Sequence, residues 1–292
     1  MSAPQQLQYT VIEQFVQGKR PDQAQGEDAI VTAPYLCAVI DGGTNGEIVF
    51  PDGRKPGRVA RDVLMSAIPG LPGDITAERA IPALDRALHD WYREHGMLEE
   101  ALHTPGHRIS ASAIILSVAH RQIWMIGDCQ ALVNGEFHTN TKAVDDLLAE
   151  VRAFVNEAAR RAGQRREELL RQDPGRQKIE DLIGRQRYFQ NPGPGEPVSP
   201  YDYYVLDGFL PADTPIKIVE LPDAEVDVVL TSDGYPWVHS TLAESEEHLH
   251  QLLEQDPLLT SHFVSTKGVV PGNHSFDDRA YLRVRVPERS NN

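Results

Sequence analysis

The sequence is poor in cysteine and contains no long apolar run. Its 292 residues include two cysteines, Cys37 and Cys129, which is too few for a disulfide framework and is typical of a protein in a reducing cytoplasm. No apolar stretch approaches the length of a membrane span. Residues 1–8 are polar and lack the apolar core of a signal peptide. We therefore predict a cytoplasmic protein.

Positive charge is also scarce. The chain has 28 lysines and arginines against 43 aspartates and glutamates, a net charge of −15. This excess argues against nucleic acid or an anionic membrane as a partner. The apolar content of 40% and charged content of 24% are ordinary for a globular protein. The length suffices for a large core, and we expect a single domain over residues 1–292.

A short apolar run that ends in an acidic residue stands out in residues 226–234, Val-Asp-Val-Val-Leu-Thr-Ser-Asp-Gly. The run Val228–Leu230 predicts a strand that is buried on both faces. It ends in Asp233-Gly234. Taken alone, such a pair more often marks a simple turn, although it is also a common way to present a metal ligand at the end of a strand.

Three other strand ends carry acidic residues. Asp41-Gly42 follows the apolar run 35–40, Gly127-Asp128 follows the run 122–126, and Asp277-Asp278 precedes the run 280–286. Four such sites are unlikely to be four independent turns, and strands lying side by side would bring the carboxylates together. Because clustered carboxylates cannot all stay ionised and unpaired, the pattern indicates hard divalent cations.

The remaining pattern predicts helices between groups of strands. Apolar residues recur at helical spacing in 59–67, 76–96 and 142–163. The arginine-rich stretch 164–190 also contains many acids, which favours a solvated helical face over a nucleic-acid surface. We predict a short strand at 201–206. This order favours an α+β fold of two antiparallel sheets with helices outside, and residues 143–207 form a divergent segment within it.

These motifs, in this order, resemble those of the metal-dependent serine/threonine phosphatases of the PP2C (PPM) type, from Glu27 to Val286. The resemblance implies a four-layer αββα sandwich, in which two antiparallel sheets are flanked by helix pairs. The segment from 160 to 207 corresponds to a divergent flap that shapes substrate choice. The matching residues are Glu27-Asp28, Asp41-Gly42, Ser112-Ala113, Gly127-Asp128, Ser232-Asp233-Gly234 and Asp277-Asp278.

The same resemblance implies a set of metal ligands. Two cations that share one water lower its pKa and present hydroxide to a phosphate ester, so no covalent nucleophile is needed. Cys37 and Cys129 are accordingly expected to be inert. Two Mn²⁺ or Mg²⁺ ions would be held by Glu27, Asp41, the carbonyl of Gly42, Asp233 and Asp277, with Asp128 contributing to a third, weaker site.

The chain departs from the family at the proton donor. Eukaryotic members have a histidine after the Asp-Gly pair, where this chain has Gly43. The leaving group would then be protonated by water or by another residue. His274 is a candidate, although a lone loop histidine is more often a surface residue. Lys19 and Arg20 are candidates for binding the substrate phosphate.

The predicted function is hydrolysis of a phosphomonoester by a metal-dependent enzyme, with a serine/threonine phosphoprotein or a small phosphomonoester as substrate. A catalytically impaired regulatory binding module of the same fold is the alternative, favoured by the missing histidine. The intact set of acids argues against complete loss of metal binding. A metal-dependent hydrolase of unrelated fold is a third, weaker hypothesis. The sequence does not distinguish Mn²⁺ from Mg²⁺ or indicate an oligomeric state.

Overall fold

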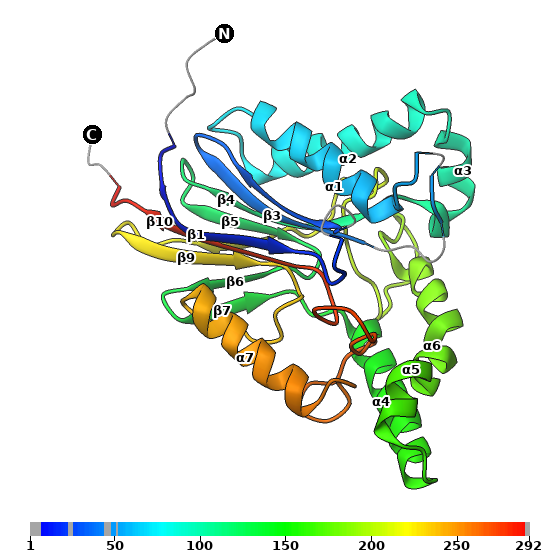
Figure 1. The fold of residues 1–292 in the computed structure, drawn as a ribbon. Helices are drawn as coiled ribbons and strands as arrows, with labels where there is room; N and C mark the ends of the chain where they lie inside the picture. The colour runs from blue at the N-terminus through cyan, green and yellow to red at the C-terminus, as the bar shows by residue number, and fades with distance from the viewer. Residues whose placement is uncertain (1–6, 23–25, 44–47, 51, 290–292) are drawn as a thin grey trace.

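Two antiparallel sheets stack face to face at the centre of the computed structural model, which describes residues 7–22, 26–43, 48–50 and 52–289 (Figure 1). In sheet A the strand order is β1 (Thr10–Gln17), β10 (Arg279–Val286), β9 (Val226–Thr231), β6 (Gln130–Val133) and β7 (Glu136–Thr139). In sheet B it is β2 (Asp28–Thr32), β3 (Leu36–Gly42), β4 (Ala111–Ser117), β5 (Gln122–Ile126) and β8 (Lys217–Glu220).

The apolar runs are continuous because the central strands are covered on both faces. In β3, Ala38 and Ile40 pack toward the helices outside sheet B. The alternate residues Cys37 and Val39 pack between the two sheets. The same alternation places Val228 of β9 between the sheets and its neighbour Val229 in a cluster on the outer face of sheet A. The predicted doubly buried strands are confirmed.

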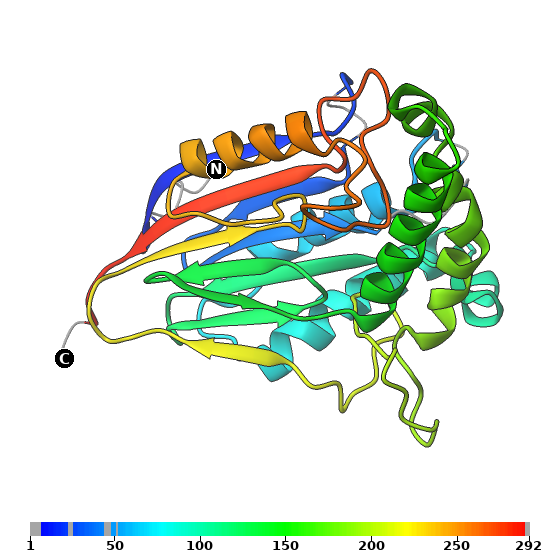
Figure 2. The same ribbon diagram turned by 90° about the horizontal axis from the view of Figure 1, so that it is seen from below.

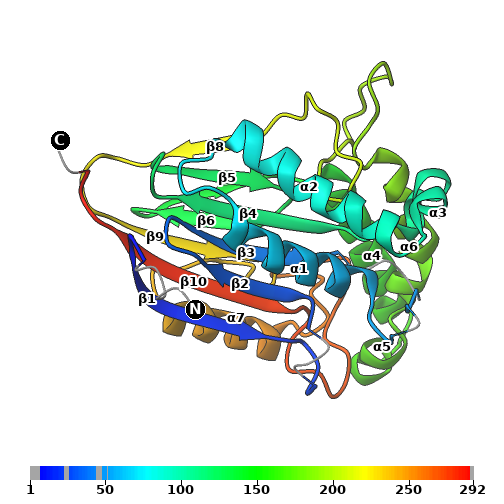
Figure 3. The same cartoon turned by 90° about the horizontal axis from the view of Figure 1, so that it is seen from above.

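Helices cover both outer faces of the sandwich. On sheet B lie α1 (Pro56–Ala67) and α2 (Ala77–Glu94), with α3 (Leu98–His103) after them (Figure 3). On sheet A lies α7 (Leu242–Gln255) (Figure 2). The predicted α+β sandwich of two antiparallel sheets with helices outside is therefore confirmed. None of the described helices is both long and apolar enough to cross a membrane.

A helical group stands at one end of the sandwich (Figure 1). It consists of α4 (Ala143–Arg161), α5 (Arg166–Gln172) and α6 (Pro174–Arg185), and α4 confirms the helix predicted at 142–163. The strand predicted at 201–206 is wrong, because this segment forms only isolated bridges at Tyr203 and Leu206. Tyr203 and Val205 instead pack against apolar residues of α4 and α6. Their aromatic and branched side chains therefore cover these helices and do not belong to a sheet.

Candidate metal centre

The register of sheet B brings four residues of the predicted motifs to one end of the sheet. Asp28 at the start of β2 pairs directly with Asp41 at the end of β3, and Asp41 pairs with Ser112 on β4. The Ser112 hydroxyl donates a 2.7 Å hydrogen bond to Oδ1 of Asp128, in the turn that follows β5. Asp41 and Asp128 therefore flank the same serine, as their positions at strand ends predict.

Sheet A contributes acids at its corresponding end. Asp233 follows β9, and Asp277 precedes β10, its antiparallel neighbour. Between them, the amide of Ser232 donates to the Ala280 carbonyl at 3.2 Å, and the Ala280 amide donates to the Ser232 hydroxyl at 2.9 Å. Gly234 is required here, because a Cβ would lie 2.1 Å from the Asp278 carbonyl oxygen.

Asp278 joins the two sheets at this end. Its Oδ2 accepts a 2.8 Å hydrogen bond from the backbone amide of Glu27, and its Oδ1 accepts one of 2.7 Å from the amide of Lys19. The Asp278 carboxylate therefore fixes the backbone at Lys19, after β1, and at Glu27, before β2. The sequence pattern pointed to Asp278 only as the neighbour of Asp277 and indicated no separate role for its carboxylate.

Glu27 and Gly42 lie together against the start of α1. The Gly42 amide donates to the Glu27 carbonyl at 3.1 Å. A Cβ on Gly42 would lie 2.3 Å from the carbonyl oxygen of Gly57, and one on Gly57 would lie 2.9 Å from Oε1 of Glu27. These contacts explain why glycine follows Asp41. They also bring the Glu27 carboxyl to the same end of the sandwich as Asp41.

The acids influence one another strongly. Burial raises the pKa of Asp41 well above its ordinary value, and the negative charges of Asp28, Asp128 and Asp277 raise it further. Burial also raises the pKa of Asp233, followed by the charges of Asp41, Asp277 and Asp128. Residues that are far apart in the sequence therefore share one electrostatic site, as the sequence predicts.

Two lysines neutralise part of this charge. Nζ of Lys19 lies 2.8 Å from Oδ1 of Asp277, and Nζ of Lys267 contacts Oδ2 of the same carboxylate. Burial alone would raise the pKa of Asp277, but the two ammonium groups lower it well below its ordinary range. Lys267 lies in the irregular loop before β10, and no pattern in the sequence pointed to it.

The other predicted residues lie at the rim of the cluster. Arg20 and Lys19 line a small hollow of about 20 Å³ together with Asp278. His274 is exposed, and its backbone amide donates to the Lys19 carbonyl at 2.8 Å. The phosphate-binding role of Lys19 and Arg20 and the proton-donor role of His274 stay predictions.

As the side chains stand, no three carboxylate, histidine or cysteine groups within the described part of the chain are arranged to hold one cation. Asp277 is instead bonded to two ammonium groups, and the charges of Asp41 and Asp233 repel each other.

The donor atoms nevertheless fit a hard divalent cation. They are carboxylate oxygens and a backbone carbonyl, the ligands that Mg²⁺ prefers and Mn²⁺ accepts. In addition, the buried Oδ2 of Asp28 has no hydrogen-bond partner among the described residues. A buried oxygen without a partner costs free energy unless a proton or cation compensates it. The residues therefore suit Mn²⁺ or Mg²⁺.

No family model matches the sequence, and no curated protein matches it significantly. Solved structures of phosphatases do match. They include the catalytic domain of the serine/threonine phosphatase PstP with two manganese ions (16% identity, 94% of this chain and 99% of that chain, TM-score 0.47). They also include Stp1 from Staphylococcus aureus (14%, 97% and 98%, 0.47) and the PPM phosphatase MsPP from Mycobacterium smegmatis (13%, 95% and 100%, 0.45). These are proteins of the kind that the sequence resembles.

Proposed function

We propose that the chain is a metal-dependent phosphomonoester hydrolase that acts on serine/threonine phosphoproteins or on small phosphomonoesters. The observation that supports this proposal best is the convergence of Asp41, Asp128, Asp233 and Asp277 from both sheets, where the charges of Asp128 and Asp277 raise the pKa of Asp41 and Asp233. A partly buried group of four acids, from strand ends far apart in the sequence, is costly for folding and is typical of functional sites.

In this proposal the acids hold two Mn²⁺ or Mg²⁺ ions, through Glu27, Asp41, the Gly42 carbonyl, Asp233 and Asp277, with Asp128 at a third, weaker site. The bound ions supply a more acidic water for attack on phosphorus and offset the charge that develops on the phosphoryl oxygens.

The chain's own groups orient the substrate. Lys19 and Arg20 lie beside the cluster, where their positive charges attract the phosphoryl group. Lys19 remains protonated because Asp277 and Asp278 raise its pKa, although burial alone would lower it. Either His274 at the rim or water delivers a proton to the leaving alkoxide. Gly43 beside Asp41 carries no side chain that could do so.

The test is hydrolysis of an aryl phosphate with Mn²⁺ or Mg²⁺ and with excess chelator. We expect activity only with the ion, and a loss of about 100-fold or more in Asp233→Asn, because removing one ligand charge weakens both ion binding and charge stabilisation. Asp181→Asn, at an exposed position on α6, is the matched control. Activity that persists in chelator, or that is unchanged in Asp233→Asn, contradicts the proposal.

A second candidate is a regulatory binding module that has lost catalysis. It is favoured by the two lysines on Asp277, which already neutralise a predicted metal ligand, and by Gly43 in place of the family's histidine. Calorimetry distinguishes the two: the enzyme binds divalent ions, whereas the module shows no binding at millimolar concentration and no hydrolysis.

A further inference from the structure

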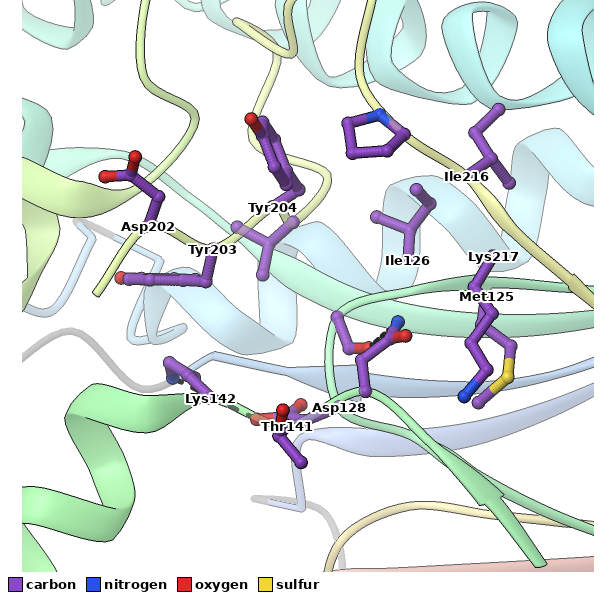
Figure 4. Close-up of a pocket in the computed structure, with 14 residues that line it drawn as sticks. Met125, Ile126, Asp128, Thr141, Lys142, Asp202, Tyr203, Tyr204, Ile216 and Lys217 are labelled. Atoms are coloured by element: carbon purple, nitrogen blue, oxygen red, sulfur yellow. Dashed lines mark hydrogen bonds and ion pairs between the residues drawn. The ribbon is translucent and has the colours of Figure 1, made fainter. Parts of the chain in front are cut away.

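A cavity of about 350 Å³ lies next to the candidate metal centre (Figure 4). It is bounded by the end of β5, by the residues before α4, by residues 202–205 and by residues 215–217 at the start of β8. Its volume lies in the range of sites for small organic molecules. Asp128 is the one proposed metal ligand that lines this cavity, and neither Lys19, Arg20 nor His274 is among its lining residues.

Asp128 connects the cavity to the cluster. It lines the cavity and accepts a 2.7 Å hydrogen bond from the hydroxyl of Ser112, the residue that pairs with Asp41 across β3 and β4. A phosphoryl group held at the cluster would therefore have its organic part directed toward this cavity. Substrates that fill the space would gain binding energy that is unavailable to substrates with a small leaving group.

The chemistry of the walls favours an apolar, ring-sized occupant. Figure 4 shows Ile126 and Ile216 on one side and the rings of Tyr203 and Tyr204 on the other. The Tyr203 ring is held rigidly, because its hydroxyl donates to Gln190 at 3.2 Å. Apolar side chains and aromatic faces are the surfaces that pack well against a planar ring.

Positive charge lies at two points of the cavity. Nζ of Lys142 lies 4.6 Å from the centroid of the Tyr203 ring and 4.0 Å from Oδ2 of Asp128. Lys217 donates to the Thr139 carbonyl at 2.6 Å. These charges complement an anionic ligand and disfavour a cationic one.

We propose that this cavity binds the organic group of a small phosphomonoester that carries an aromatic ring. The inference rests on the proposed function and narrows its substrate class. We assign a free small molecule as the ligand, because the cavity of about 350 Å³ is walled by four separate segments of the chain and has the volume of a small-molecule site.

The experiment compares benzyl phosphate with methyl phosphate, whose leaving alcohols are of similar acidity, so that intrinsic reactivity is matched. We expect kcat/KM to be about tenfold or more higher for benzyl phosphate, the discrimination expected for burial of an aromatic ring. Tyr204→Ala removes one wall, and Thr141→Trp fills the cavity from an exposed position on its rim. Both variants should reduce the preference to about threefold or less.

Tyr188→Ala is the matched control, since Tyr188 is 76% exposed and does not line the cavity; it should keep the wild-type preference. Binding of benzylphosphonate and methylphosphonate, which are not hydrolysed, is measured by calorimetry in the presence of Mn²⁺ as a readout independent of turnover. Preferential binding of benzylphosphonate that is lost in Tyr204→Ala and Thr141→Trp supports the cavity even if no ester is hydrolysed, in which case only the proposed function fails.

Equal kcat/KM values for the two esters together with equal affinities for the two phosphonates would overturn the inference, while hydrolysis of both esters leaves the proposed function standing. A phosphoserine peptide with phenylalanine next to the phosphoserine provides the last arm. If it is hydrolysed with a higher kcat/KM than benzyl phosphate, the assignment to small molecules is overturned.

Discussion

In the proposed metal centre, Lys267 competes with the ion for Asp277, and removing its charge should strengthen metal binding. A cation that binds Asp277 there displaces a charge-assisted contact between Nζ of Lys267 and Oδ2 of Asp277. Such hydrogen bonds contribute about 1.5–3 kcal/mol. The Lys267 side chain is 36% exposed, so solvent screening places the contribution near the lower end of that range. About 1.4 kcal/mol corresponds to a tenfold change in dissociation constant.

We therefore expect Lys267→Met to bind Mn²⁺ about tenfold more tightly than the wild type. Calorimetric titration at fixed pH and salt measures this directly. The rise in melting temperature at a given Mn²⁺ concentration gives a second readout, because a ligand that binds the folded state stabilises it by mass action. Lys178→Met, at an exposed position on α6, controls for the loss of one positive charge. An affinity of Lys267→Met equal to or below that of the wild type would refute the reasoning.

Three further predictions concern stability. Arg152 is fully buried and donates to Asp173 and to three carbonyls of the loop 258–265. Arg152→Met should lower the free energy of unfolding in urea by about 3 kcal/mol or more, whereas the exposed Arg160→Met should change it little. Burial and a neighbouring acid raise the pKa of Asp85 to about 6. The contribution of Asp85 to the free energy of unfolding is therefore greatest below its ordinary pKa and is lost as the pH rises through 6. The difference in free energy of unfolding between the wild type and Asp85→Asn should shift by about 1 kcal/mol between pH 5 and pH 7. A difference that stays constant over this pH range contradicts the assigned pKa. Gly42→Ala has no room for its Cβ, so circular dichroism should show a lower melting temperature, and an unchanged one would contradict the packing.

The strand-end acids were predictable because two simple rules coincide there. A strand covered on both faces must be apolar along its length, so an abrupt Asp-Gly ending such as Asp41-Gly42 stands out. Antiparallel neighbours then bring such endings together whatever their separation in sequence, as Asp233 and Asp277 show. The helix α4 was predictable for a similar reason, since its apolar residues recur at a spacing set by local geometry.

The loops were not predictable, because their side-chain partners depend on contacts between distant segments. Lys267 lies in an irregular stretch with no periodicity, and its pairing with Asp277 follows from how the whole loop packs. The segment 201–206 has the composition of a strand, yet Tyr203 and Val205 pack against α4 and α6. Aromatic and branched residues favour strands only where a neighbouring strand is available to pair with them.

The pairing of β1 with β10, from Thr10↔Arg285 to Gln17↔Arg279, has a consequence for the order of events during synthesis. Sheet A cannot be completed until residues near 280 have left the ribosome, because its edge strand is held by the last strand of the described chain. Glu27 and Asp41 are made early and must wait for Asp277, so a nascent chain lacks the full acidic cluster. Contacts between such distant segments also slow folding, and the proposed metal centre should therefore form only at the end of the protein's maturation.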